Sequence, residues 1–347
     1  MTRNIHSIAF FGMLTACGGA HQGTYEVGAA AEGTDSAAAM SEADTHWDAR
    51  GDAGELQAAL TGYEAVVAAD PTNRVALERL VRGYYFLGDG HNTEDADKLA
   101  SWDTAINWGK QCMALNSDFV AQLDKGVTEA AAGATAFTKD DVPCVYWTAS
   151  ALGKWAKLTS FGTLLKNKDL VKAWITKVDE LDDVYFYTAS TRYWGAYYAI
   201  APSFAGGDLG KSKVYFDEAI AANPGHFGNR ILLAEAWATK QQNETPVEAL
   251  NVFDEQLTYV LSNCANNLDG LEPEQEAEQR KANALLGKRT ELFLEAGDMA
   301  AIETPDCTAP AEEPAVEEAP AEEGSEEAGA EGTAPTMGPP PAPPAAE

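Results

Sequence analysis

Three stretches of this chain share a spacing of small and aromatic residues that restricts the fold to helices packed in pairs. In each stretch an aromatic follows a small residue by four positions: Ala59 and Tyr63, Ser212 and Phe216, and Ala249 and Phe253. Residues four apart lie on one helical face, where the small residue admits a neighbouring helix and the aromatic fills the groove between them. In the first two stretches a proline follows eight residues after the aromatic (Pro71 and Pro224), and proline cannot continue a helix.

This spacing is typical of the second helix of a tetratricopeptide repeat. The first-helix signature is incomplete, since no stretch carries the full Trp, Leu-Gly and Tyr set. An ordinary helical bundle with the same spacing is the alternative. We predict an all-α fold, a degenerate tetratricopeptide-like array of helical hairpins (an α-α superhelix) with about a dozen helices. Val184–Tyr187 has the composition of a strand but fits the helical period, so helix is predicted there too.

The charge of the chain excludes one class of partner. Lysine and arginine number 24 against 54 acidic residues, which gives a formal net charge of −30. A phosphate backbone would repel such a protein, so we expect no nucleic-acid partner.

The N-terminus has the pattern of a bacterial lipoprotein signal. Arg3 precedes an apolar run, residues 8–14, that is too short to span a bilayer and suits a secretory signal. Leu14-Thr15-Ala16-Cys17 resembles the lipobox, so Cys17 is the predicted lipidation site. A plain secretory signal with a chance cysteine is the alternative. Gly18 is not the aspartate of inner-membrane retention, which favours the outer membrane.

Changes in composition divide the chain into four predicted segments. After the signal peptide, the Gly-, Ala- and Ser-rich residues up to 41 form a flexible tether. The final residues are acidic and rich in Pro and Ala, and they bury too little apolar surface to fold. The predicted segments are a signal peptide with lipobox (1–17), the tether (18–41), a helical domain (42–302) and a disordered tail (303–347).

Capping and breaker residues set the expected helix boundaries in the helical domain. Ser41 is expected to cap the first helix and Thr72 the third, which Gly88-Asp89-Gly90 breaks. Single helices are expected over residues 118–132, 168–181, 185–201 and 273–294.

Four cysteines remain besides Cys17, an even number in an oxidising compartment. We prefer the pairs that are near in sequence, Cys112 with Cys144 and Cys264 with Cys307. The two other connectivities stay open. No CxxC motif or His/Cys spacing indicates a metal site.

The sequence carries no motif for catalysis. It has no GxSxG, no P-loop and no GxGxxG before a strand, and its five histidines are scattered. Solvated helix faces explain the many carboxylates better than acid/base chemistry does. We therefore predict a protein that is not an enzyme and needs no cofactor.

Aromatic residues in the middle of the chain are the one candidate binding surface. Trp147, Ala151 and Trp155 share a helical face, and Gly153 offers close approach to a neighbouring helix. Such residues can be core packing, or they can line a cleft in a helical array that holds an apolar ligand or a segment of a partner. The predicted ligand-binding residues are Trp147, Trp155, Trp194 and Tyr197.

Four stretches of the chain carry a resemblance to a known family: residues 143–158, 195–220, 231–238 and 281–289. The most specific part is the turn Gly206-Gly207-Asp208-Leu209, which leads into a helix with Tyr215 and Phe216. Together these stretches resemble the T component of TRAP transporters, a family of periplasmic tetratricopeptide lipoproteins. The resemblance covers roughly residues 45–295, although residues 243–246 and 264–273 depart from the usual spacing.

The resemblance implies a non-enzymatic lipoprotein that faces the periplasm from a lipid anchor in the cell envelope. It further implies a periplasmic TRAP solute-binding protein as partner, a cleft or pore suited to hydrophobic small molecules, and the capacity to form a homotrimer. The alternative function is a tetratricopeptide scaffold that organises envelope proteins and binds no small ligand. A third class, an envelope hydrolase, would need a buried carboxylate pair or a metal site, and no spacing indicates either.

Overall fold

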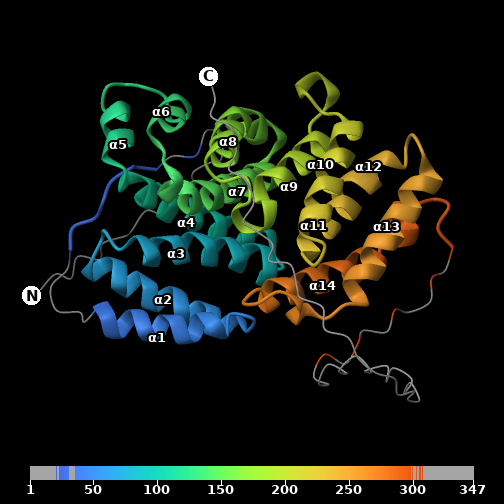
Figure 1. The fold of residues 1–347 in the computed structure, drawn as a ribbon, viewed down its shortest axis with the longest axis horizontal. Coiled ribbons are helices and arrows are strands. Elements are labelled where there is room, and N and C mark those ends of the chain that lie inside the picture. Colours follow the sequence, from blue (N-terminus) through green and yellow to red (C-terminus); the bar gives the residue numbers. More distant parts are fainter. Residues whose placement is uncertain are drawn as a thin grey trace, which may run out of the picture. The chain divides into compact units, whose positions relative to one another are not determined.

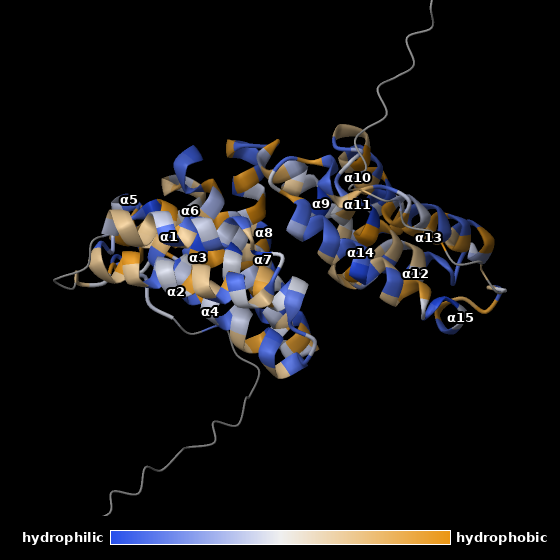
Figure 2. Ribbon diagram, turned by 90° about the horizontal axis from the view of Figure 1, so that it is seen from below, coloured by the Kyte–Doolittle hydropathy of each residue, from blue (hydrophilic) through white to orange (hydrophobic). Residues whose placement is uncertain are grey.

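The computed structural model describes residues 21, 23–30, 36–297, 299, 302, 305 and 307. In these residues the chain is an array of helices without a strand, which confirms the predicted all-α fold. Within each helix, polar and apolar residues are interleaved (Figure 2). No helix in the described ranges is long and apolar enough to cross a membrane. Arg3, Cys17 and the acidic tail after residue 307 lie outside the described residues.

The array begins with four helices, each of which packs on the next (Figure 1). Asp52 caps the second of them, because its carboxylate accepts hydrogen bonds from the backbone N–H groups of Gly54 and Glu55. The helices are α1 (Ser36–Asp48), α2 (Ala53–Ala69), α3 (Arg74–Phe86) and α4 (Asp95–Ala114).

The structure corrects three boundaries in this region. Ser41 lies inside α1 and does not cap it. Asn73, not Thr72, caps α3, since its side chain accepts from the N–H of Ala76. Gly88-Asp89-Gly90 does not break the chain but continues it as the π-helix η1 (Leu87–His91). The missing side chain at Gly88 serves packing, because a Cβ there would lie 2.6 Å from the indole nitrogen of Trp102.

The middle of the array has two short helices and three long ones. The single helix predicted over 118–132 is wrong, since α5 (Ser117–Leu123) and α6 (Glu129–Ala136) are separated by a turn in which Gly126 has a φ of +80°. The long helices are α7 (Val142–Thr159), α8 (Phe161–Leu181) and α9 (Tyr185–Ile200), and α7 packs on both α4 and α8.

The start of α9 is the most strained backbone among the described residues. Phe186, Tyr187 and Thr188 have φ values of 42°, 60° and 55°, in the left-handed region. The prediction of a regular helix from residue 185 is therefore wrong over this turn. The side chains explain why the turn is held: the Tyr187 carbonyl accepts from Arg192, and the Thr188 hydroxyl accepts from Asn223.

The last third of the array forms a second buried cluster. Its helices are α10 (Leu209–Ala222), α11 (Phe227–Leu232), η4 (Leu233–Ala238), α12 (Thr239–Gln241), α13 (Pro246–Leu261), α14 (Glu272–Leu286) and α15 (Arg289–Leu292). A break after Leu286 divides the helix predicted over 273–294. All six residues of the three small–aromatic pairs are fully buried, so the spacing does mark packed helices; the tetratricopeptide assignment stays an interpretation.

Part of the segment predicted as a free tether lies against the helices. The His21 side chain is 4% exposed, and its Nε2 lies 2.8 Å from an Asp103 carboxylate oxygen. The His21 and Trp155 rings pack edge-on with their centroids 5.2 Å apart, and the Tyr25 and Phe119 rings pack edge-on with the same centroid distance. Aromatic contacts therefore dock this segment at His21 and Tyr25, whereas the other described residues from 23 to 30 are exposed.

Helix α14 returns to the first third of the chain and closes the array. The Glu274 carboxylate on α14 forms largely buried ion pairs with two guanidinium groups, with N–O distances of 2.8 Å to Arg50 and 2.6 Å to Arg82. Further along α14, Arg280 donates to the carbonyl of Gly90 in η1. These polar contacts join segments about 190 to 220 residues apart and hold α14 against Arg50, α3 and η1.

Candidate functional site: an apolar cleft with basic residues

Helices α7, α8 and α9 line an open cleft of about 470 Å³, to which α11, η4 and α12 also contribute lining residues. This volume lies within the roughly 300–1,000 Å³ of small-molecule pockets in proteins. Most of the lining is apolar. The apolar side chains include Phe161, Leu164, Leu165, Val171, Ile200 and Leu232.

Helix α9 supplies one wall of the cleft. Arg192, Tyr193, Ala196, Tyr197 and Ile200 line it, and their spacing of one, three and four residues places them on one helical face. The Tyr197 hydroxyl donates to the carbonyl of Ala205 at 2.8 Å. This bond ties the turn after α9 to the helix, so that end of the cleft is formed by fixed backbone.

A buried arginine lies in the same wall. Arg192 is 6% exposed, and its guanidinium donates to the Tyr187 carbonyl at 3.2 Å, the Asn229 side-chain oxygen at 2.9 Å and the Tyr146 hydroxyl at 3.2 Å. All three acceptors are neutral. Burial, followed by the charge of Arg192, holds the pKa of His226 well below its usual value. Arg192 therefore places a buried guanidinium in the cleft wall, halfway along α9.

Lys154 of α7 also lines the cleft, but it has a counter-ion. Its ammonium lies 2.5 Å from the Asp89 carboxylate of η1, and Asp89 in turn pairs with Lys281 of α14 at 2.7 Å. Burial alone lowers the pKa of Lys154, but Asp89 together with Tyr85 and Glu235 outweighs burial and raises this pKa well above its usual value. Lys154 is thus a charged and anchored part of the cleft wall.

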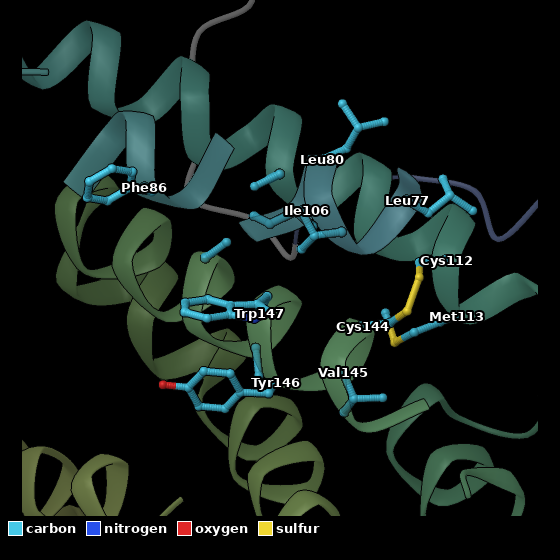
Figure 3. Packing of buried hydrophobic residues seen from close by; sticks show 14 of the residues in the cluster. Leu77, Leu80, Phe86, Ile106, Cys112, Met113, Cys144, Val145, Tyr146 and Trp147 are labelled. Carbon is cyan, nitrogen blue, oxygen red and sulfur yellow. A yellow bond between two sulfur atoms is a disulfide. The ribbon is translucent and has the colours of Figure 1, made fainter. Parts of the chain in front are cut away.

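Only one of the four predicted binding residues lines the cleft, namely Tyr197. Trp147 is 5% exposed and belongs to the first core, where its indole N–H donates to the Tyr185 hydroxyl at 3.0 Å (Figure 3). Trp155 packs on His21. The Trp194 ring centroid lies 5.7 Å from that of Tyr197, but Trp194 does not line the cleft.

Helix geometry explains why the two tryptophans of α7 do not line the cleft. Ala149, Gly153 and Ala156 face the cleft, whereas Trp147 and Trp155 lie on other sides of the same helix. Apart from Tyr197, sequence reasoning missed the residues that line the cleft. A usable signal was present in residues 154–168, where lysines precede and follow Phe161, Leu164 and Leu165.

The described residues offer no alternative centre for metal chemistry, since they contain no group of three or more His, Cys, Asp or Glu side chains that could hold an ion. The four cysteines are paired in the structure as Cys112 with Cys144 and Cys264 with Cys307. The first pair joins α4 to α7 inside the core (Figure 3).

Comparisons with known proteins place the chain in a family. A search of curated proteins gives no match. A scan against protein families matches residues 53–293, about two thirds of the chain, to the TRAP transporter T-component family (TAtT). That family is a transporter component and not an enzyme family, and it works at the cell envelope. With its all-α array and a match over most of its described helices, this chain belongs to the TRAP transporter T-component family.

Proposed function

We propose that this protein is a non-enzymatic periplasmic lipoprotein that assists a TRAP transporter by holding an apolar ligand and binding the system's solute-binding protein. The observation that carries the proposal is the 470 Å³ cleft in the array of a T-component family member. An apolar cleft of this size suits a small molecule, and its walls are rigid helices that can present the ligand to a partner.

The lipid anchor and the outer-membrane location belong to the same proposal. Their support is the lipobox at Cys17 and the glycine that follows it. His21 is docked on the helices only four residues after Cys17, and four extended residues span at most about 14 Å. The anchor would therefore hold the body close to the membrane surface.

The partner and the oligomeric state are proposed from the family. The partner is a periplasmic TRAP solute-binding protein, and the assembly is a homotrimer. Large apolar side chains stand exposed on the array at Phe161, Val184 and Phe204, with exposed fractions of 55%, 68% and 80%. Phe161 also lines the cleft, so a partner that covers it would lie directly over the ligand.

The test is native mass spectrometry of the full chain purified from its own cell envelope, with lipid extraction of the same sample. We expect a co-purifying apolar molecule and a solute-binding protein in a fixed ratio. Ala196→Trp fills the cleft wall and should remove the molecule, whereas Ala134→Trp, on the exposed side of α6, should not. The same spectra report whether the chain is a trimer.

Two outcomes would contradict the proposal. An empty protein that carries envelope-assembly proteins and no transport partner would favour the scaffold function. A molecule that survives Ala196→Trp in a folded variant would show that it binds elsewhere than in the cleft.

A further inference from the structure

We propose that the ligand of the cleft is an amphipathic anion, with one apolar chain along α9 and a carboxylate or phosphate head group bound by Arg192. This inference rests on the proposed function, because it assumes that the cleft holds a ligand. It adds the charge of the ligand and the residue that recognises it.

The charge of the cleft is the reverse of the charge of the chain. The whole sequence has 24 basic and 54 acidic residues. The lining has one acidic residue, Glu235, which is exposed, against five basic ones: Lys154, Lys157, Lys168, Arg192 and Lys240. A local excess of cations in so acidic a protein concentrates anions at the opening and repels cations.

Arg192 is the most buried of these five basic residues and has no counter-ion. No carboxylate forms an ion pair with it among the residues that the structure describes, and its three acceptors are neutral. A buried charge without an opposite charge is costly, and the cost falls when an anion enters the site. The planar guanidinium matches the two oxygens of a carboxylate or phosphate, and such charge-assisted bonds are among the strongest in proteins.

A second buried arginine serves as a comparison. Arg230 is 8% exposed and likewise has no carboxylate partner in the described ranges. Its guanidinium, however, stacks on the Tyr259 ring at 3.4 Å and does not line the cleft. The ring face satisfies part of its charge. Arg192 differs in that a ligand-sized space, not an aromatic face, lies beside it.

The other lining residues define the place of the apolar chain. From Arg192 to Ile200 the cleft follows α9 for eight residues, a rise of about 12 Å. Leu164, Leu165 and Val171 of α8 face this path from the opposite wall. Burial of each methylene there strengthens binding about fourfold, so the chain supplies affinity and the head group supplies selectivity.

The experiment compares ligands with one chain and different heads. Dodecanoate, dodecyl phosphate, dodecanol and dodecyltrimethylammonium are titrated below their micelle-forming concentrations into the chain from residue 18 to 347, which retains every described residue. Isothermal titration calorimetry gives the four dissociation constants. We expect at least one of the two anions to bind tenfold or more tightly than dodecanol, and the ammonium compound to bind more weakly than dodecanol. The comparison of carboxylate with phosphate identifies the head group.

Arg192→Gln tests the recognising residue, with Arg230→Gln as the matched buried-arginine control. Arg192→Gln should abolish the preference for anions while dodecanol still binds, and Arg230→Gln should keep that preference. Arg192 also holds the turn at Tyr187, so circular dichroism must show that the variant is folded. If it is not, the head-group series on the unchanged chain still decides the proposal.

The outcomes separate this inference from the proposed function. Equal affinity for dodecanol and both anions, or tighter binding of the ammonium compound, overturns the inference and leaves the cleft as an apolar binding site. Binding of none of the four compounds contradicts the proposed ligand site itself, and the inference falls with it.

Discussion

Asp89 and Lys281 form an ion pair of 2.7 Å across 192 residues of sequence. The other oxygen of Asp89 binds Lys154 at 2.5 Å. One carboxylate therefore links η1, α7 and α14, and it fixes a lysine that lines the cleft. Burial alone raises the pKa of Asp89, but the two ammonium groups outweigh it and hold this pKa well below its usual value.

Asp89→Asn should destabilise the fold. The change leaves two ammonium groups together without their shared counter-ion, and breaking a buried pair costs about 3–5 kcal/mol. The lysine side chains are 36% and 29% exposed, so solvent screening reduces the expected loss to about 2 kcal/mol. Urea unfolding at pH 7 measures this loss in the free energy of unfolding. Asp169→Asn removes an exposed pair with Lys168 and should change the free energy of unfolding by less than about 0.5 kcal/mol. Equal effects of the two changes would contradict the role of Asp89.

The same carboxylate should make the stability depend on pH in acid. The pKa of Asp89 is lower in the folded protein than its ordinary value of about 3.9, so the unfolded chain binds its proton more tightly. The contribution of Asp89 is therefore complete above about pH 5 and is lost as the pH falls through the unfolded-state pKa toward the folded-state pKa. Between pH 5 and pH 3 the free energy of unfolding should fall more steeply for the unchanged protein than for Asp89→Asn. Parallel curves would show that Asp89 does not titrate differently in the two states.

Local signals predicted the helices well and their ends less well. The starts of α10 and α13 are encoded locally, because the Asp208 side chain accepts from the Lys211 N–H and proline fixes φ at Pro246, the first residue of α13. The prediction of a break at Gly88 was wrong, since the missing side chain there makes room for Trp102 of the next helix, α4, and no capping or breaker rule reveals that packing. The left-handed turn at residues 186–188 involves a contact that is distant in sequence, because Asn223 donates to the Thr188 hydroxyl across 35 residues.

The cleft was only partly predictable. Periodicity shows which residues of α7 share a face, but it does not show which face meets the core. Both tryptophans chosen on that helix lie off the cleft, while Tyr197 on α9 lines it. Arg192 looked like an ordinary helical residue in sequence, and only its burial beside the cleft distinguishes it.

Two glycines on facing helices should respond in opposite ways to alanine. A Cβ at Gly109 of α4 would lie 1.8 Å from the Thr148 hydroxyl oxygen of α7, so Gly109→Ala should cost about 1–3 kcal/mol through overpacking. Gly153 of α7 was expected to allow close approach, but no atom lies within 4 Å of a Cβ built there. Gly153→Ala should therefore stabilise the helix by up to about 1 kcal/mol. Thermal unfolding of both variants measures the contrast, and destabilisation by Gly153→Ala would contradict the open space.

The disulfide between α4 and α7 should carry a large part of the stability of the first core. Both cysteines are fully buried, and they close a loop of 32 residues. Replacing Cys112 and Cys144 together by serine should lower the free energy of unfolding by about 2–4 kcal/mol. Mass mapping of the protein without reduction should find Cys112 joined to Cys144 and Cys264 joined to Cys307. A peptide that joins Cys112 to Cys264, or free thiols, would overturn the pairing.

Substitutions at Trp147 and Tyr197 should affect different properties, the first the stability of the fold and the second the affinity for the ligand. Trp147→Phe removes the hydrogen bond to Tyr185 and shrinks a buried ring, so it should lower the free energy of unfolding by about 1–3 kcal/mol. Because Trp147 is not in the cleft wall, affinity for dodecanoate should not change. Tyr197→Ala removes an aromatic side chain from the cleft wall and should weaken the binding of dodecanoate and of dodecanol alike. Each loss of about 1.4 kcal/mol in binding free energy raises the dissociation constant roughly tenfold. Loss of dodecanoate binding in a folded Trp147→Phe variant would show that Trp147 takes part in ligand binding. Unchanged binding in Tyr197→Ala would show that α9 does not form part of the ligand site.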